Sequence, residues 1–325
     1  MNFKILNTIG KVYTEEAKEI LNKLGDVNYL DLTQEEFIQV IEEYDILVVG
    51  LGLKINKEVL SKAKKLKVIA TATTGLDHID LDYAEAQGIE VISLRGENEF
   101  LDTITGTAEL SFGLMIDLMR FTHGAFRDVQ DYKWDREKWR GHNLSEKTLG
   151  IVGMGRLGKM MAHFGSAFGM NIIFFDPNIE QESFPLYKKV SFTELVSEGD
   201  VISIHVHLSE DTENMFGKQV FEKMKNSALL INTSRGKIVN EYDLLKAIKN
   251  NEIAGYGTDV LADELDFDKG FSDHPMVEYS KNNNNLIIVP HIGGMTYESR
   301  EKTDVFIAEK IERYLKSKNK QSKAK

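Results

Sequence analysis

The chain has 325 residues, enough for about two domains, and 40 basic against 51 acidic residues give a net charge of −11. That balance argues against nucleic acid or an anionic membrane as a partner. The absence of cysteine excludes disulfides, thiol nucleophiles and cysteine-ligated metal sites. Residues 1–10 show no secretory signal, and no apolar run approaches the roughly 18 residues of a membrane helix, so we expect a cytoplasmic protein.

The first hundred residues alternate between short apolar, β-branched runs and amphipathic runs. The short runs predict buried strands at residues 2–6, 45–50, 67–71 and 90–94. The amphipathic runs predict helices at residues 15–24, 34–42 and 57–63. Strands that alternate with helices indicate an α/β fold whose parallel sheet is covered on both faces.

A long helix is predicted at residues 103–120, and a second strand–helix series follows it. Its strands are expected at residues 149–153, 171–176, 201–206, 228–233, 254–259 and 286–289. Its helices are expected at residues 157–168, 192–197, 218–224 and 241–249. This count predicts a six-stranded, doubly wound parallel sheet, with a last helix at residues 297–315. Residues 262–285 show no clear element, and the lysine-rich residues 316–325 are expected to fray into solvent.

A glycine-rich turn follows the strand predicted at residues 149–153. Gly153-Met154-Gly155-Arg156-Leu157-Gly158 matches the G-x-G-x-x-G pattern and leads into a helix. Gly153 permits the tight turn, Gly155 lets the backbone approach a pyrophosphate, and Gly158 lets the helix pack on the strand. The next predicted strand ends at Asp176, which can accept hydrogen bonds from a ribose and repel the extra phosphate of NADP. NAD binding is therefore favoured over glycines that serve packing alone.

Three polar groups follow the last strands of the second series, where ligands bind in open α/β sheets. Arg235 can clamp a carboxylate, His291 can exchange a hydroxyl proton, and Glu264 can orient the histidine. Each residue alone is typical of ordinary surface or structural positions, and it is their joint placement that favours catalysis. His205 and His207 share one face of a strand, but no third ligand is evident, so we expect no metal site.

Together these segments resemble the D-isomer-specific 2-hydroxyacid dehydrogenase family over nearly the whole chain. The most specific matches are residues 148–158, Ile231 to Gly236, Thr258-Asp259-Val260 with Glu264, and Pro290-His291-Ile292-Gly293-Gly294. The resemblance implies two Rossmann-like domains with the active site in the cleft between them. Residues 1–100 and 296–325 would form the substrate domain, and residues 101–295 the NAD-binding domain. It also implies a homodimer that binds a small 2-oxoacid or 2-hydroxyacid.

The resemblance further assigns roles to individual residues. Arg235 would bind the substrate carboxylate, His291 would be the acid/base, and Glu264 would support His291. The carboxylate would also meet the backbone amides of a loop formed by Thr73, Thr74 and Gly75. The expected cofactor contacts are Thr107, Gly153, Gly155, Arg156, Leu157, Gly158, Asp176, His207, Thr212, Thr233 and Asp259.

The resemblance leaves the substrate and one alternative function open. Phosphoglycerate-type members often carry an arginine where this chain has Thr71, and Arg95 is the nearby loop cation. We therefore expect an unphosphorylated 2-oxoacid. The alternative is an NAD(H)-sensing binding protein with little turnover. Formate dehydrogenase, which has glutamine in place of Glu264, is disfavoured.

Overall fold

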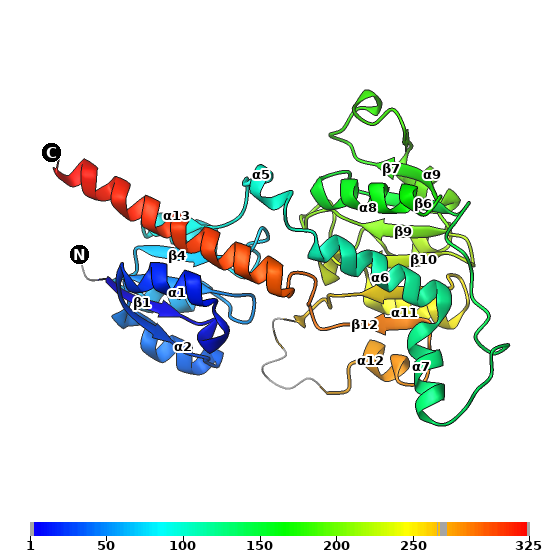
Figure 1. Cartoon of the computed structure of the whole chain (residues 1–325), viewed down its shortest axis with the longest axis horizontal. Coiled ribbons are helices and arrows are strands. Elements are labelled where there is room, and N and C mark those ends of the chain that lie inside the picture. The colour runs from blue at the N-terminus through cyan, green and yellow to red at the C-terminus, as the bar shows by residue number, and fades with distance from the viewer. Residues whose placement is uncertain (1–2, 265, 267–271, 324–325) are drawn as a thin grey trace. The chain divides into compact units, whose positions relative to one another are not determined.

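The computed structural model describes residues 3–264, 266 and 272–323, with side chains to residue 320. The chain forms two compact units, which are drawn in Figure 1. Unit 1 comprises Met1–Leu101, Leu265–Gly270 and Thr296–Lys325, and unit 2 comprises Asp102–Glu264 and Phe271–Met295. Unit 2 is thus inserted in sequence between the two main parts of unit 1.

Unit 1 is built on a five-stranded parallel sheet in the order β2-β1-β3-β4-β5. Its strands are β1 (Phe3–Asn7), β2 (Gly25–Tyr29), β3 (Ile46–Val49), β4 (Val68–Thr71) and β5 (Glu90–Ile92). Four of these were predicted. The sequence analysis missed β2, because Gly-Asp-Val-Asn-Tyr has one aliphatic residue and lies, partly exposed, at an edge where only β1 pairs with it.

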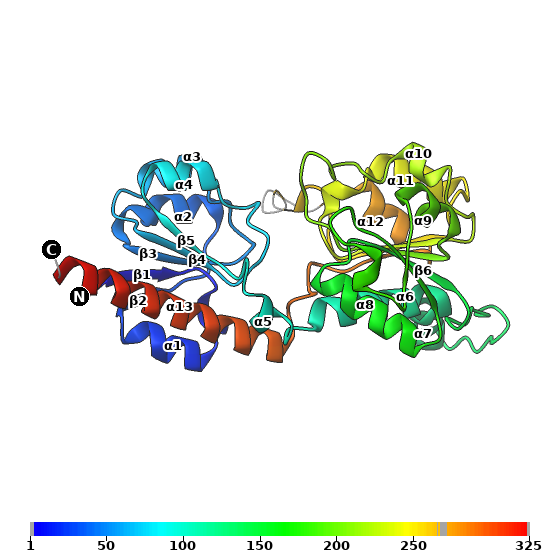
Figure 2. The ribbon, with the colours of Figure 1, turned by 90° about the horizontal axis from the view of Figure 1, so that it is seen from above.

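Helices cover both faces of this sheet (Figure 2). On one face lie α1 (Glu15–Asn22) and α13 (Tyr297–Lys323), and on the other lie α2 (Gln34–Val40), α3 (Lys57–Lys62) and α4 (Leu81–Ala86). Alternate strand residues serve the two cores: Ile5 packs with α1 and α13, whereas Leu6 packs with α2 and α3. Short helical segments are η1 (Gly10–Val12), η2 (Ile41–Glu43) and α5 (Asn98–Leu101).

The C-terminal helix is longer than predicted. We expected residues 316–325 to fray, but α13 continues to Lys323, so that prediction is wrong for the described part of the tail. An i,i+4 ion pair of 2.9 Å between Glu312 and Lys316 spans the junction, and no proline or glycine interrupts the tail. Residues 324–325 lie outside the described residues.

A buried carboxylate lies on α13. Asp304 is fully buried, and the Nη2 atom of Arg300 lies 2.9 Å from its Oδ1 and 3.0 Å from its Oδ2. The Tyr13 hydroxyl donates to the backbone oxygen of Asp304 at 3.1 Å. Burial, the largest cause, raises the pKa of Asp304 to about 6 although Arg300 opposes the rise.

Unit 2 contains a seven-stranded parallel sheet in the order β12-β11-β10-β9-β6-β7-β8. Its strands are β6 (Thr148–Val152), β7 (Asn171–Phe175), β8 (Lys188–Lys189), β9 (Val201–Ile204), β10 (Leu229–Asn232), β11 (Gly255–Thr258) and β12 (Leu286–Ile288). All six predicted strands are present. The prediction missed β8, a two-residue edge strand of lysines, which has no apolar pattern.

Two layers of helices enclose the second sheet (Figures 1 and 2). One layer is α6 (Gly106–Arg120) and α8 (Arg156–Ala167); the other is α9 (Phe192–Glu198), α10 (Lys218–Phe221), α11 (Glu241–Lys249) and α12 (Pro275–Ser280). Helix α7 (Thr122–Gln130) follows α6, and η3 (Gln181–Ser183) and η4 (Gly236–Ile238) are single turns. Helix α12 corrects the expectation that residues 262–285 hold no element. Across the described residues, no helix has the length and apolarity that a membrane crossing requires.

Candidate active site

The glycine-rich turn lies at the centre of the second sheet, where β6 and β9 are neighbours. The chain leaves these strands toward opposite sides of the sheet, which creates the crevice where dinucleotides bind in doubly wound folds. Gly153 has a φ of +92°, and a Cβ atom there would lie 2.6 Å from the carbonyl oxygen of His205. A Cβ atom on Gly158 would lie 2.1 Å from the carbonyl oxygen of Gly153. The fold itself therefore requires the first and third glycines.

The second glycine is different, because the fold does not need it. A Cβ atom on Gly155 would meet nothing within 4 Å. Gly155 is the N-cap of α8, so the free amides and positive end of that helix face the same open space. A backbone kept bare toward open space at a helix N-terminus fits a pyrophosphate group.

Asp176 and Arg156 brace the glycine turn. Asp176 follows β7, and its Oδ2 accepts a 2.9 Å hydrogen bond from the amide of Met154, inside the turn. Arg156 and Leu157 begin α8, and the Arg156 Nη1 donates to the carbonyl oxygen of Ile104 at 2.5 Å. Burial lowers the pKa of Arg156. Asp176 is thus anchored to the glycine turn, and its contact with a ribose stays a prediction.

Ser111, which the sequence analysis missed, connects Thr107 and Thr233, two of the predicted cofactor contacts. The Ser111 hydroxyl donates to the Thr107 carbonyl oxygen at 2.7 Å and lies 2.6 Å from the Thr233 hydroxyl. Thr107 also borders Gly293, where a Cβ atom would lie 3.2 Å from its side chain. Ser111 carried no signal beyond its i+4 spacing from Thr107. These contacts join the start of α6, the end of β10 and the turn that follows His291.

The loop after β9 holds His207 and Thr212. The Thr212 hydroxyl donates to the His207 carbonyl oxygen at 2.6 Å and accepts from the Ser209 amide at 2.8 Å, which closes a compact turn. His207 is exposed, whereas His205 is half-buried with its Nε2 2.8 Å from the Ser203 hydroxyl. Burial lowers the pKa of His205 to about 3, so its imidazole is neutral at pH 7. Across the described residues no group of three or more metal-ligating side chains forms.

The histidine and glutamate predicted for proton transfer are in contact. The Nδ1 of His291 lies 2.7 Å from Oε1 of Glu264, and both side chains keep about a quarter of their surface exposed, 26% and 22%. The contact fixes one ring nitrogen and leaves Nε2 for another partner. His291 and Glu264 are 27 residues apart in sequence, and they meet because β11 and β12 are adjacent and parallel.

Asp259 holds His291 in an unusual backbone conformation. His291 has a φ of +53°, a left-handed conformation that costs a β-substituted residue about 1 kcal/mol. The Asp259 carboxylate accepts from the amides of Ile292 at 2.6 Å and Gly293 at 2.8 Å, and its carbonyl oxygen accepts from the His291 amide at 2.9 Å. Burial raises the pKa of Asp259, and the two amides oppose that rise. Its predicted contact with the cofactor stays a prediction.

Arg235 leaves the same edge of the sheet from β10. Its carbonyl oxygen accepts from Asn232 Nδ2 at 3.0 Å, and its Nη1 donates to the Ser234 carbonyl oxygen at 2.8 Å. Because β10, β11 and β12 are consecutive in the sheet, the loops that carry Arg235, Glu264 and His291 emerge side by side. The loop that carries this cation and the loops that carry the histidine–carboxylate pair therefore share one edge of the sheet.

The predicted carboxylate loop belongs to unit 1 and follows β4. The Thr73 hydroxyl donates to the Gly75 carbonyl oxygen at 2.8 Å and lies 3.1 Å from the Thr71 hydroxyl, so the loop is braced internally. Within the described residues, the backbone amides of Thr73, Thr74 and Gly75 have no hydrogen-bond acceptor. They are available to an anion, and their role in a shared site stays a prediction.

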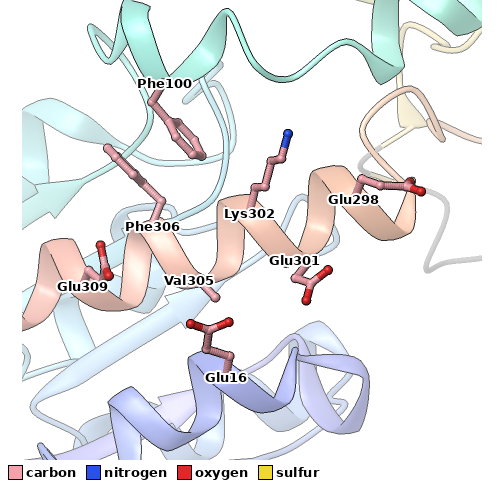
Figure 3. Close-up of a pocket in the computed structure, with 8 residues that line it drawn as sticks. All are labelled: Glu16, Phe100, Glu298, Glu301, Lys302, Val305, Phe306 and Glu309. Atoms are coloured by element: carbon pink, nitrogen blue, oxygen red, sulfur yellow. The ribbon is translucent and has the colours of Figure 1, made fainter.

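A groove elsewhere on unit 1 is less suited to an anionic substrate. It has a volume of about 400 Å³ and runs between α1, α5 and α13 (Figure 3). Phe100 and Phe306 stack in it at 3.9 Å, and its remaining lining is Glu16, Glu298, Glu301, Lys302, Val305 and Glu309. Four glutamates against one lysine repel a carboxylate ligand.

Comparisons with known proteins agree with this geometry. The family described as D-isomer specific 2-hydroxyacid dehydrogenase, NAD binding domain, matches residues 112–293. The chain is 36% identical to a glyoxylate reductase of Thermococcus litoralis, over 86% of this chain and 83% of the relative. It is 34% identical to a D-3-phosphoglycerate dehydrogenase of Methanocaldococcus jannaschii, over 93% of this chain and 56% of the relative.

A solved structure gives the same result for the fold. D-lactate dehydrogenase of Aquifex aeolicus, complexed with NAD and lactic acid, superposes with a TM-score of 0.84 at 26% identity, over 99% of this chain and 98% of that one. The chain spans about half the length of the curated phosphoglycerate dehydrogenases that it matches. The match to the family covers more than half of the chain and includes the glycine turn, Arg235, Glu264 and His291. The chain belongs to the D-isomer specific 2-hydroxyacid dehydrogenase family and contains its NAD-binding domain.

Proposed function

We propose that this protein is an NAD-dependent oxidoreductase that transfers a hydride between the nicotinamide and C2 of a D-2-hydroxyacid or 2-oxoacid. The observation that carries the proposal is the 2.7 Å contact of His291 with Glu264 on the sheet edge that also presents Arg235. Turnover, as opposed to NAD(H) sensing alone, is supported by relatives that bear the names of reductases and dehydrogenases.

Bound NAD would supply the hydride acceptor, and bound NADH the hydride donor. In this proposal the amides around Gly155 hold the pyrophosphate and Asp176 accepts from the adenosine ribose. Thr107, Arg156, Leu157, His207, Thr212, Thr233 and Asp259 complete the proposed cofactor contacts. The open space at Gly155 and the anchored Asp176 support this placement.

The chain's own residues would manage the substrate and its proton. During reduction, His291 Nε2 donates a proton to the carbonyl oxygen as C2 receives the hydride; in oxidation it removes the hydroxyl proton as the hydride leaves. Glu264 fixes the ring through Nδ1. Arg235 pairs with the substrate carboxylate, which also meets the amides of residues 73–75.

The same residues favour a small, unphosphorylated substrate. Thr71 is fully buried and uncharged, and Arg95 is exposed. Burying a dianionic phosphate without paired donors is costly. The glyoxylate reductase of Thermococcus litoralis and the hydroxypyruvate reductase of Thermotoga maritima match this chain over most of their own length, 83% and 94%. We therefore place glyoxylate and hydroxypyruvate ahead of 3-phosphohydroxypyruvate.

The organisation of the molecule is part of the proposal. Residues 1–100 and 296–325 would act as the substrate domain and residues 101–295 as the NAD-binding domain, in a cytoplasmic homodimer. Large apolar side chains of α7 and the loop after it are exposed, at 63% for Phe126, 99% for Tyr132 and 84% for Trp134. Exposed aromatic residues in one stretch are typical of a protein interface and support assembly through unit 2.

NADH oxidation with a panel of 2-oxoacids, repeated with NADPH, tests the function. We expect turnover with NADH and glyoxylate, hydroxypyruvate or pyruvate, and a lower kcat/KM with NADPH and with 3-phosphohydroxypyruvate. Tight NADH binding with negligible oxidation across the panel would instead support a sensor. Efficient reduction of 3-phosphohydroxypyruvate, lost in Arg95→Ala, would make Arg95 a phosphate ligand and overturn the proposed substrate class.

A further inference from the structure

A second carboxylate lies behind the Glu264 turn and has no part in the mechanism above. Glu241 is the first residue of α11, and its side chain is only 17% exposed. Its Oε1 accepts a 2.8 Å hydrogen bond from the amide of Ala262, and its Oε2 lies 3.4 Å from Nε2 of His274. One carboxylate therefore contacts the chain on both sides of Glu264 in sequence.

The contact at Ala262 reaches Glu264 within a single turn. The amide of Leu261 donates to Oε2 of Glu264 at 3.4 Å, and the amide of Glu264 donates to the carbonyl oxygen of Leu261 at the same distance. Both are long, weak hydrogen bonds. The bond from Ala262 to Glu241, at 2.8 Å, is the shortest of these three backbone-amide hydrogen bonds.

The turn also packs against the loop that carries the substrate-binding arginine. A Cβ atom on Gly236, next to Arg235, would lie 2.1 Å from the carbonyl carbon of Leu261 and 2.3 Å from the amide nitrogen of Ala262. The two backbones are therefore in direct contact. A displacement of Ala262 would move both this contact and Glu264.

Burying the carboxylate of Glu241 costs free energy, and this cost favours a role for the residue. Burial raises the pKa of Glu241, while the Ala262 amide and His274 oppose the rise. The desolvated carboxylate of Glu241 is stabilised by these two partners and by the N-terminus of α11. An apolar residue could cap this space without that cost, but it could not accept a hydrogen bond from Ala262.

We propose that Glu241 is a positioning residue for the reaction: by accepting from Ala262 and contacting His274, it fixes the turn that presents Glu264 to Nδ1 of His291. This inference rests on the proposed function, because it requires that the His291–Glu264 pair does the proton chemistry. Misplacing a catalytic partner by about 1 Å costs on the order of 100-fold in rate.

The test is a double-mutant cycle on kcat with Glu241→Ala and Glu264→Gln. We expect Glu241→Ala to lower kcat by about 10- to 100-fold in the parent, with KM for NADH and its Kd changed less than about threefold. In the Glu264→Gln background the same substitution should have almost no effect on kcat, because the residue through which it acts is already impaired. Glu241→Gln keeps an acceptor oxygen for Ala262 and should restore kcat to within about threefold of the parent.

Asp243→Asn is the matched control. Asp243 lies in the same first turn of α11 and also accepts a backbone amide, that of Lys218 at 3.1 Å, but it does not touch the Glu264 turn. We expect it to leave kcat at the parental value. If Glu241→Ala fails to fold, Glu241→Asp, whose shorter side chain withdraws the oxygen from Ala262, takes its place in the cycle.

The failures are distinguishable. An equal loss of kcat from the Glu241 substitution in both backgrounds, or an equal loss from Asp243→Asn, would overturn the positioning role and leave the proposed function standing. Parental kcat in Glu264→Gln would overturn the proposed proton chemistry, and this inference with it.

Discussion

Gly155→Ala separates what the fold requires from what a ligand requires. The added methyl group meets nothing within 4 Å, and the φ of −70° and ψ of −161° at Gly155 suit alanine. We therefore expect the free energy of unfolding to change by less than about 1 kcal/mol. If a pyrophosphate occupies this space, the methyl group must push it away from the amides of α8.

The expected loss of affinity follows from the hydrogen bonds at stake. A hydrogen bond to a charged group contributes about 1.5–3 kcal/mol, so losing one weakens NADH binding by about 10- to 150-fold. Isothermal titration calorimetry measures the Kd of NADH, and thermal unfolding without ligand measures stability in the same preparation.

Gly158→Ala is the control with the opposite expectation. Its methyl group would lie 2.1 Å from the Gly153 carbonyl oxygen, so it must displace backbone, and overpacking of this kind costs about 1–3 kcal/mol. We expect a lower Tm for this variant without NADH. Parental NADH affinity in Gly155→Ala would refute the reasoning, because it would show that no phosphate approaches this turn.

Four further results are expected. His291→Ala should lower kcat by about 10²- to 10⁴-fold with NADH affinity nearly intact, as stopped-flow and titration can show; near-normal turnover would remove His291 from the mechanism. Glu264→Gln removes the carboxylate that holds Nδ1 of His291, so kcat for 2-oxoacid reduction should fall with NADH affinity nearly intact; a parental kcat would exclude the pairing. Asp176→Ala should narrow the ratio of kcat/KM for NADH over NADPH, and a parent without preference would contradict the ribose contact. The pKa of Asp304 is about 6 in the folded protein, above the ordinary 3.8. Protonation of this carboxyl group therefore adds about 3 kcal/mol to the free energy of unfolding below about pH 4, and this contribution is lost as the pH rises through 6. The asparagine in Asp304→Asn does not titrate, so the urea midpoint of this variant should vary less between pH 4 and 7 than that of the parent. Parallel plots of urea midpoint against pH would disprove the raised pKa of Asp304.

The sequence predicted the parts of the fold that carry strong apolar patterns. Buried strands such as β6 and β9 are continuous apolar runs, because helices cover both faces of the sheet. The edge strands β2 and β8 were missed, since pairing on one side leaves their side chains partly exposed and removes the need for that pattern. Helix α12 was missed because it is six residues long and buries mainly Met276.

Residues of the candidate site could be predicted from the sequence where they directly follow the ends of predicted strands. The order of Arg235, Glu264 and His291 predicted that their loops share one edge of the sheet, because consecutive parallel strands end there; the roles of these residues stay predictions. The supporting contacts were not predictable. Ser111 and Glu241 make tertiary hydrogen bonds to residues far from them in sequence, and no local pattern predicts such contacts.

The discontinuous chain of unit 1 sets an order of events during synthesis. One face of its sheet is covered by α13, whose Ile307, Ala308 and Ile311 are buried against Ile5 and Ala17. The whole of Asp102–Glu264 and Phe271–Met295 leaves the ribosome between these partners. At about 5–20 residues per second, that interval lasts roughly 10–40 s.

By the end of that interval unit 2 has the strands and helices that bury its own core, whereas the face of the unit 1 sheet that carries Ile5 still lacks α13. A nascent chain stopped before α13 therefore exposes strand residues such as Ile46 and Val68, which are fully buried when α13 is in place. Helix α13, which is made after unit 2, is therefore needed to cover this face of unit 1.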